Sequence, residues 1–143
     1  MSYKDFRPRL KGDKKIAYDN LTTSERRILV IGDIHAPFEL EGYLDFCKET
    51  YAKHLCNQVV FIGDIIDNHY TSYHETSSDG LGGADELHHA IETVRERKKA
   101  FPVADVIIGN HDRMCMRKAQ TSDIPSAWIK SYNEVLGTNW NWV

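Results

Sequence analysis

The chain has 143 residues, of which 41% are hydrophobic and 27% charged, a composition typical of a folded domain and unlike that of a disordered segment. Its net charge of −3 argues against indiscriminate binding to nucleic acids or membranes, and no apolar stretch approaches the length of a membrane span. Three cysteines without a CxxC or Cys–His zinc spacing favour a reducing, cytoplasmic compartment over a disulfide-stabilised protein.

Residues 1–27 form a polar segment that is more basic than the rest of the chain. They contain 8 Lys/Arg and 4 Asp/Glu, whereas residues 28–143 contain 10 and 17. The cations of this segment suit the phosphates of a nucleic acid, but terminal segments usually carry loose structure. We therefore expect residues 1–27 to be a solvated leader and residues 28–143 to form the main domain.

Three short apolar runs, at residues 28–31, 59–62 and 106–108, are predicted to be buried strands. Between them, apolar residues repeat at helical spacing over Leu40–Cys56 and again over Ala84–Phe101. In the second of these helices, Leu87, Ile91, Val94 and Phe101 form the expected buried face and residues 96–99 the solvated face. The order predicts a βαβαβ unit with a parallel sheet, interrupted by a long polar connection at residues 68–83.

The C-terminal part of the chain predicts a third helix and a last strand. The helix would cover Asp123–Gly137, with Pro125 in its first turn and Gly137 at its end. Its apolar face would contain Ile124, Trp128, Ile129, Tyr132 and Leu136. Trp140 and Trp142 alternate with asparagines, as in a half-buried strand, and we expect this strand to be interrupted and to find no partner.

Each predicted strand is followed by glycine and by residues that commonly bind metals. The set is Asp33, His35, Asp64, Asp67, Asn110 and His111. Because the carboxyl ends of parallel strands meet at one edge of a sheet, we expect these side chains to lie together. An alternative is that the Asp and Asn residues are helix N-caps, but three caps would not also bring two histidines. Carboxylate, imidazole and amide ligands suit a pair of divalent cations.

In order and spacing, three segments resemble the motifs of the calcineurin-like metallophosphoesterases. They are Asp33-Ile34-His35, Gly63-Asp64-Ile65-Ile66-Asp67 and Gly109-Asn110-His111-Asp112, matching Asp-x-His, Gly-Asp-x-x-Asp and Gly-Asn-His-Asp. The resemblance implies a hydrolase in which two cations activate water and clamp a phosphoester. It also implies a four-layer α/β/β/α sandwich, of which this chain supplies the βαβαβ half. Manganese is the first choice of cation, with iron, zinc, magnesium or cobalt as alternatives.

The resemblance also implies a role for each residue. The metal ligands would be Asp33, His35, Asp64 and Asn110, with Asp64 bridging the two cations. His111 would act as general acid toward the leaving oxygen, and Asp67 would hold the imidazole of His111 in position. Asp112 would support these residues from behind at most. Phosphomonoesters, phosphoproteins, cyclic nucleotides and nucleic-acid ends are all compatible substrates. Asp67-Asn68-His69 departs from the Asp-Arg-Gly of the phosphoprotein-phosphatase branch, which disfavours that class.

The family pattern continues with one more metal-binding histidine and a Gly-His-x-His segment, but the sequence has no histidine after His111. We therefore expect an incomplete domain whose sheet exposes an apolar face near Trp140 and Trp142. A C-terminal half, a partner chain or self-association would cover that face. Two alternatives stay open: a metal-binding scaffold module without catalysis, and replacement of a missing ligand by His69 or His74.

Overall fold

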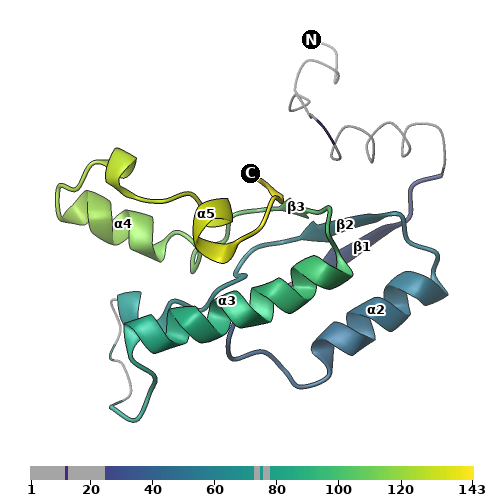
Figure 1. Ribbon diagram of the computed structural model, residues 1–143, viewed down its shortest axis with the longest axis horizontal. Coiled ribbons are helices and arrows are strands. Elements are labelled where there is room, and N and C mark those ends of the chain that lie inside the picture. Colours follow the sequence, from purple (N-terminus) through teal and green to yellow (C-terminus); the bar gives the residue numbers. More distant parts are fainter. Residues whose placement is uncertain (1–11, 13–24, 73–74, 76–77) are drawn as a thin grey trace.

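The computed structural model describes residues 12, 25–72, 75 and 78–143, and within them four parallel strands form one sheet. The strands lie in the order β1 (Ile28–Ile31), β2 (Gln58–Phe61), β3 (Asp105–Val106) and β4 (Asn141–Trp142). Helix α2 (Tyr43–Lys53) connects β1 to β2, and α3 (Gly83–Ala100) connects β2 to β3 (Figure 1). The predicted α/β class and the βαβαβ order are therefore confirmed. The predicted leader, apart from residues 12 and 25–27, lies outside the described residues.

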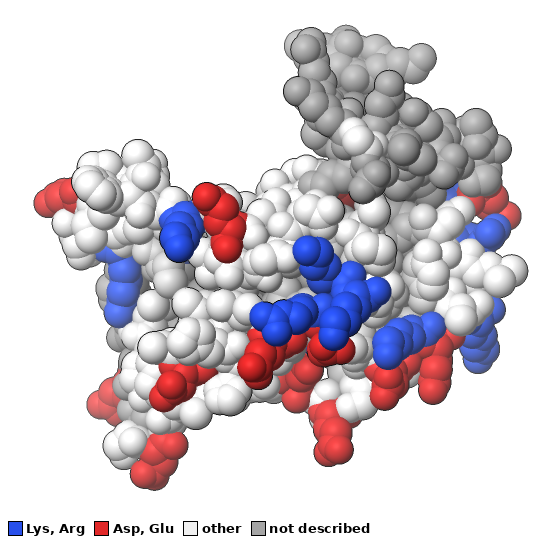
Figure 2. Space-filling view, in the orientation of Figure 1, with Lys and Arg blue, Asp and Glu red and all other residues white. Residues whose placement is uncertain are grey.

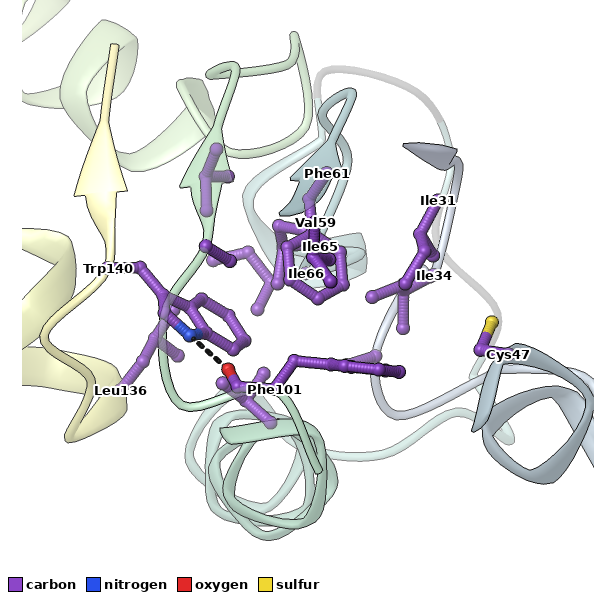
Figure 3. Close-up of a cluster of buried hydrophobic side chains, with 14 of the residues drawn as sticks. Ile31, Ile34, Cys47, Val59, Phe61, Ile65, Ile66, Phe101, Leu136 and Trp140 are labelled. Carbon is purple, nitrogen blue, oxygen red and sulfur yellow. Dashed lines mark hydrogen bonds between the residues drawn. The ribbon is translucent and has the colours of Figure 1, made fainter. Parts of the chain in front are cut away.

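The core lies between the sheet and its helices. Alternate strand residues point to this side and are buried, namely Leu29, Ile31, Val59, Phe61 and Val106. Helix α2 packs against them through Cys47, and α3 through Ala90 and Val94. Trp140 closes the core: its ring lies 4.7 Å from that of Phe61, and its Nε1–H donates to the carbonyl of Phe101 at 2.9 Å (Figure 3).

The expectation that the last strand finds no partner is wrong. Strand β4 pairs with β3 in parallel, with Asn141 opposite Asp105 and Trp142 opposite Val106. The buried Trp140 anchors the segment on the helical side of the sheet, and not near the exposed face as expected. Asn133 adds further ties, because its side chain bonds both the carbonyl of Trp140 and the Nε1–H of Trp142.

The predicted helix Asp123–Gly137 is also wrong. The structure has α4 (Met114–Thr121) before this segment, a 3₁₀ turn η3 (Ser126–Trp128) within it and a short α5 (Tyr132–Leu136) at its end. Ile129, which follows η3, has an extended backbone (φ −98°, ψ 129°), and Ser131 and Glu134 form a capping box that starts α5. Only the end of the prediction is right, because Gly137 terminates α5 with a left-handed backbone, φ 65°.

The two longer helices match their predictions except at particular side chains. Helix α2 is shorter than predicted, and the flanking Leu40 and Leu55 are exposed. In α3, Val94 and the following Phe101 are buried as expected, but Leu87 is exposed. Arg97, expected in the solvated face, is instead buried and forms an ion pair with Glu39. A buried guanidinium needs such a carboxylate partner, and Glu39 comes from the connection before α2.

The opposite face of the sheet carries exposed apolar side chains. Ile28, Val30, Ile62 and Ile107 are 45–57% exposed, while their sequence neighbours on the helical side are buried. Helices α2 and α3 both lie on the helical side (Figure 1). The predicted exposure of one sheet face is therefore confirmed. We refer to these four residues as the open face.

The outer surface of α3 is charged with mixed sign. Its last turn contains Arg97, Lys98 and Lys99, which complement the negative end of the helix dipole. Figure 2 shows basic side chains gathered over this half of α3 and bordered by acidic ones. One pair of opposite charges is Lys99 and Glu96, with Nζ and Oε1 2.7 Å apart. No helix in the described ranges is long and apolar enough to cross a membrane.

Candidate metal centre

Three of the predicted ligands meet at the carboxyl ends of β1 and β2. His35 Nε2 lies 4.0 Å from Asp33 Oδ1 and 4.0 Å from Asp64 Oδ2. Two ligands that each lie about 2.1 Å from one cation are at most about 4.2 Å apart, so these separations are close to those of a shared ion. The three side chains can therefore hold one divalent cation after small adjustments of their rotamers.

Asp67 orients both histidines of the centre. Its Oδ1 accepts a hydrogen bond from His35 Nδ1 at 2.8 Å, which directs His35 Nε2 toward the carboxylates of Asp33 and Asp64. A histidine that binds a metal commonly has its other nitrogen bonded to a carboxylate in this way. The backbone carbonyl of Asp67 accepts from His111 Nδ1 at 2.6 Å, whereas its carboxylate lies 3.8 Å from that nitrogen. Asp67 thus holds the imidazole of His111 through its backbone carbonyl.

A second group of possible ligand atoms, from His35, Asp67 and His111, lies behind the first. The short bonds from Asp67 to the two imidazoles already use the Nδ1 atoms. We therefore interpret this second group as hydrogen bonds that orient the two imidazole rings. Within the described residues, neither group includes His69, and His74 lies outside them.

The backbone bends unusually at the centre. Asp33, His35, Asp64 and Asn68 all have φ between 40° and 53°, in the left-handed region. Non-glycine residues rarely adopt this conformation, which costs of the order of 1–3 kcal/mol each and concentrates at functional sites. Backbone bonds hold the bends in place, because the N–H groups of His35 and Ala36 donate to the carbonyls of Asp64 and Ile65 at 2.9 Å.

Two glycines allow the loops after β2 and β3 to touch. Gly63 has φ 104°, and a Cβ there would lie 2.9 Å from Gly109 Cα. A Cβ on Gly109 would overlap both the carboxylate and the amide nitrogen of Asp64. Gly109 is therefore required for space and Gly63 also for its backbone conformation. Their close approach lets the His111 N–H donate to Asp64 Oδ1 at 2.9 Å.

Asp112 has a larger role than the sequence predicted. Its side chain is buried, with Oδ1 accepting from the N–H groups of Ile65 and Ile66 and Oδ2 from that of Gly109, at 2.9–3.2 Å. Burial raises the pKa of this carboxyl, and the three hydrogen bonds offset only part of that effect. Asp112 thus clamps the loops after β2 and β3 together. The sequence shows only that Asp112 follows His111. That position does not indicate which groups the side chain contacts.

Asn110 lies in the turn between Gly109 and His111, and its side chain is exposed. The other five predicted site residues share contacts with one another, through the bonds of Asp67 and Asp64. The predicted role of Asn110 as a ligand of a second cation therefore rests on its position at the edge of this group.

The charges at the centre suit bound cations. Asp33, Asp64 and Asp67 lie together, and in the described part of the chain their ion-pair partners are the two histidines, without a lysine or arginine. Asp33 is the most open of the three, with its side chain 76% exposed, whereas Asp64 and Asp67 are 16% and 18% exposed. Carboxylates in this arrangement suit a divalent ion that prefers oxygen and nitrogen ligands.

A comparison with protein families supports the resemblance seen in the sequence. The family described as calcineurin-like phosphoesterase matches residues 26–142, nearly the whole chain. No curated protein and no solved structure gave a match.

Proposed function

Because the chain belongs to the calcineurin-like phosphoesterase family, we propose that it hydrolyses phosphoesters with two divalent cations held at the strand ends. The observation that carries the proposal is the convergence of Asp33, His35 and Asp64 on one point, with Asp67 behind the imidazole. When bound, the cations would make a water more acidic and neutralise the phosphoryl oxygens. The mixed carboxylate and imidazole donors support manganese, and three free cysteines support a cytoplasmic location.

Asp64 is the residue we assign to both cations. Its Oδ2 faces His35 Nε2, while its Oδ1 is bonded to the N–H of His111, next to Asn110. Its carboxylate therefore lies between the loop that carries the first ligands and the loop that carries Asn110. We propose Asp33, His35 and Asp64 for the first cation, and Asp64 and Asn110 for the second.

His111 is the residue we assign to the leaving group. Because the Asp67 carbonyl can only accept, His111 Nδ1 must carry the proton of their 2.6 Å bond. The tautomer is thereby fixed, and Nε2 is the nitrogen that gives a proton to the leaving oxygen when the ring is protonated. The side chain is 28% exposed, so a substrate can reach it.

We also propose that a partner segment with further histidines covers the open face. Exposed apolar residues on three neighbouring strands form a contiguous surface, and such surfaces commonly mark interaction sites. A second sheet packed there would begin next to the metal centre, since Ile62 and Ile107 lie one or two residues before Gly63 and Gly109. Its histidines would complete the coordination of the second cation, for which this chain offers Asp64 and Asn110.

The isolated chain is expected to self-associate and to show little Mn²⁺-dependent hydrolysis of bis-p-nitrophenyl phosphate or p-nitrophenyl phosphate. Addition of a partner segment bearing a Gly-His-x-His sequence is expected to restore both a monodisperse particle and turnover. Light scattering and release of p-nitrophenol measure the two effects. Val30→Lys on the open face should reduce self-association, whereas Glu49→Lys on the exposed side of α2 is the matched control and should not.

Two results would contradict these proposals. A monodisperse chain with strong metal-dependent turnover would show that no partner is needed. A restored assembly that binds Mn²⁺ but hydrolyses neither ester would favour the metal-binding scaffold module.

A further inference from the structure

A cavity of about 700 Å³ lies beside the metal centre. It is bordered by the 3₁₀ turn η2 (His69–Thr71), the first turns of α3, helix α4 and the segment from Trp128 to Leu136, and it opens to solvent. Most of its lining is apolar, including Leu87, Met116, Trp128, Ile129 and Val135. This volume falls in the range of small-molecule sites, which are typically apolar with a few polar groups.

The cavity explains two side chains that did not follow the sequence prediction. Leu87 and Trp128 were both expected on buried helix faces, yet they are 36% and 81% exposed. Both line this cavity, and Tyr70 and Tyr132 add two aromatic rings to its wall. Apolar side chains turned toward such a cavity are typical of a site that binds an apolar group.

One buried carboxylate oxygen in this apolar wall has no hydrogen-bond donor among the described residues. Glu86 is 4% exposed, and its Oε1 accepts from the N–H of His69 at 2.7 Å. Its Oε2 is buried and lacks a hydrogen-bond partner within the described structure. Buried carboxylate oxygens are normally satisfied, so this atom suits a donor that comes from a ligand. Burial also raises the pKa of Glu86, and an amino group near Oε2 would oppose that effect.

Two residues of the cavity wall are next to residues of the metal centre in the sequence. Asn68 and Asp112 line the cavity, and each directly follows a proposed site residue, Asp67 and His111 respectively. Asn68 Nδ2 also donates to the carbonyl of His111 at 2.8 Å. On the side of Asn68 and Asp112, an organic group attached to a phosphoryl at the centre would meet this apolar cavity.

We propose that the cavity binds the leaving group of the phosphoester, and that this group is an aromatic ring carrying an amino group that donates to Glu86 Oε2. The aromatic and aliphatic lining takes the ring, and the unpartnered oxygen takes the amino group. This inference rests on the proposed function for its link with a substrate, but the binding of the ring and its amine can be tested without turnover.

Calorimetric titration of the 143-residue chain with tyramine and with 4-ethylphenol tests the cavity. The two probes share a phenol ring and differ in the amino group. Tyramine should bind at least about tenfold more tightly, as expected for a hydrogen bond to a buried charged group. Glu86→Gln should abolish this preference and leave the affinity for 4-ethylphenol unchanged. The Gln side chain keeps an oxygen for the N–H of His69, so the fold is retained.

Two controls separate the cavity from other acidic groups. Glu92→Gln removes the same charge from an exposed position on the same helix and should keep the preference for tyramine. Asp64→Ala should keep it as well, because the ammonium would not be bound by the metal centre. Equal affinities for the two probes, or a preference that survives Glu86→Gln or is lost in Asp64→Ala, would overturn the assignment of the cavity.

A second measurement tests the link with the substrate. In an assembly that hydrolyses p-nitrophenyl phosphate, tyramine phosphate should be preferred to 4-ethylphenyl phosphate by about tenfold in kcat/KM, and Glu86→Gln should remove the preference. Equal kcat/KM values would overturn the leaving-group role. If no assembly of this chain hydrolysed p-nitrophenyl phosphate, while tyramine binding still depended on Glu86, the proposed function would be contradicted and an amine-binding cavity would remain.

Discussion

Replacing His111 with alanine is expected to lower kcat by roughly 10²-fold or more in an assembly that hydrolyses phosphoesters. The leaving oxygen of an alkyl ester is strongly basic and needs a proton as its bond to phosphorus breaks. His111 is fixed for this task by the 2.6 Å bond from its Nδ1–H to the carbonyl of Asp67. An aryl ester has a less basic leaving oxygen, so the decrease in kcat caused by His111→Ala should be smaller for an aryl ester than for an alkyl ester.

The measurement compares kcat for an alkyl and an aryl phosphate in the unmodified protein and in His111→Ala, with the Mn²⁺ content determined for both. His88→Ala on α3 is the matched control, because His88 is exposed and is absent from both candidate metal groups of the described residues. Metal content should be similar in all three proteins. The acid role would be wrong if the two esters lost activity equally, and a loss of Mn²⁺ would point to a ligand role.

Replacing Asp112 with alanine is expected to destabilise the fold by about 3 kcal/mol or more. Two buried N–H groups, those of Ile65 and Ile66, and the partly buried N–H of Gly109 would lose the only acceptor they have among the described residues. Each unsatisfied buried donor costs about 1–3 kcal/mol. Removing the buried carboxyl also removes the cost of its desolvation, which offsets part of the total loss of stability. Because small domains are stable by only about 5–15 kcal/mol, such a loss is large.

Urea unfolding followed by tryptophan fluorescence measures this effect, since Trp140 is buried in the core. The stability of Asp112→Asn should lie between those of Asp112→Ala and the unmodified protein. The asparagine keeps one oxygen as an acceptor, but its NH₂ group faces a backbone N–H donor. Asp45→Ala is the control: its side chain is 75% exposed and forms a surface ion pair with Lys48, so the substitution should change stability by less than about 0.5 kcal/mol. Equal midpoints for Asp112→Ala and Asp45→Ala would disprove the clamp.

The sheet and the position of the centre could be predicted because their signals are local. Runs such as 59–62 are apolar, and the glycine and ligands that follow each run mark its end. In a parallel sheet the carboxyl ends of the strands lie at the same edge, so the ligands that follow the strands are expected to lie together. The same local reasoning missed the buried pair of Arg97 and Glu39, whose members lie far apart in the sequence. It also missed the unpartnered oxygen of Glu86, which depends on how α3 packs against η2.

The C-terminal errors have a different physical origin. The apolar spacing from Ile124 to Leu136 is helical, but the extended backbone at Ile129 and the pair Ser131 and Glu134 divide the segment into two short elements. The capping box stands in the sequence as Ser-x-x-Glu at Ser131 and Glu134, and it indicates a helix start there in spite of the longer helical spacing. The pairing of β4, by contrast, depends on the burial of Trp140 against Phe61 and could not be deduced from the tail alone.

The most direct test of the proposed metal pair is a calorimetric titration of the chain with Mn²⁺, with and without the partner segment. If Asp64 serves both cations, Asp64→Ala should weaken binding at both sites, whereas Asn110→Ala should weaken only the second. Retention of Mn²⁺ binding by Asp64→Ala, or an equal loss from both variants, would contradict the assignment of Asp64 as the residue shared by two cations.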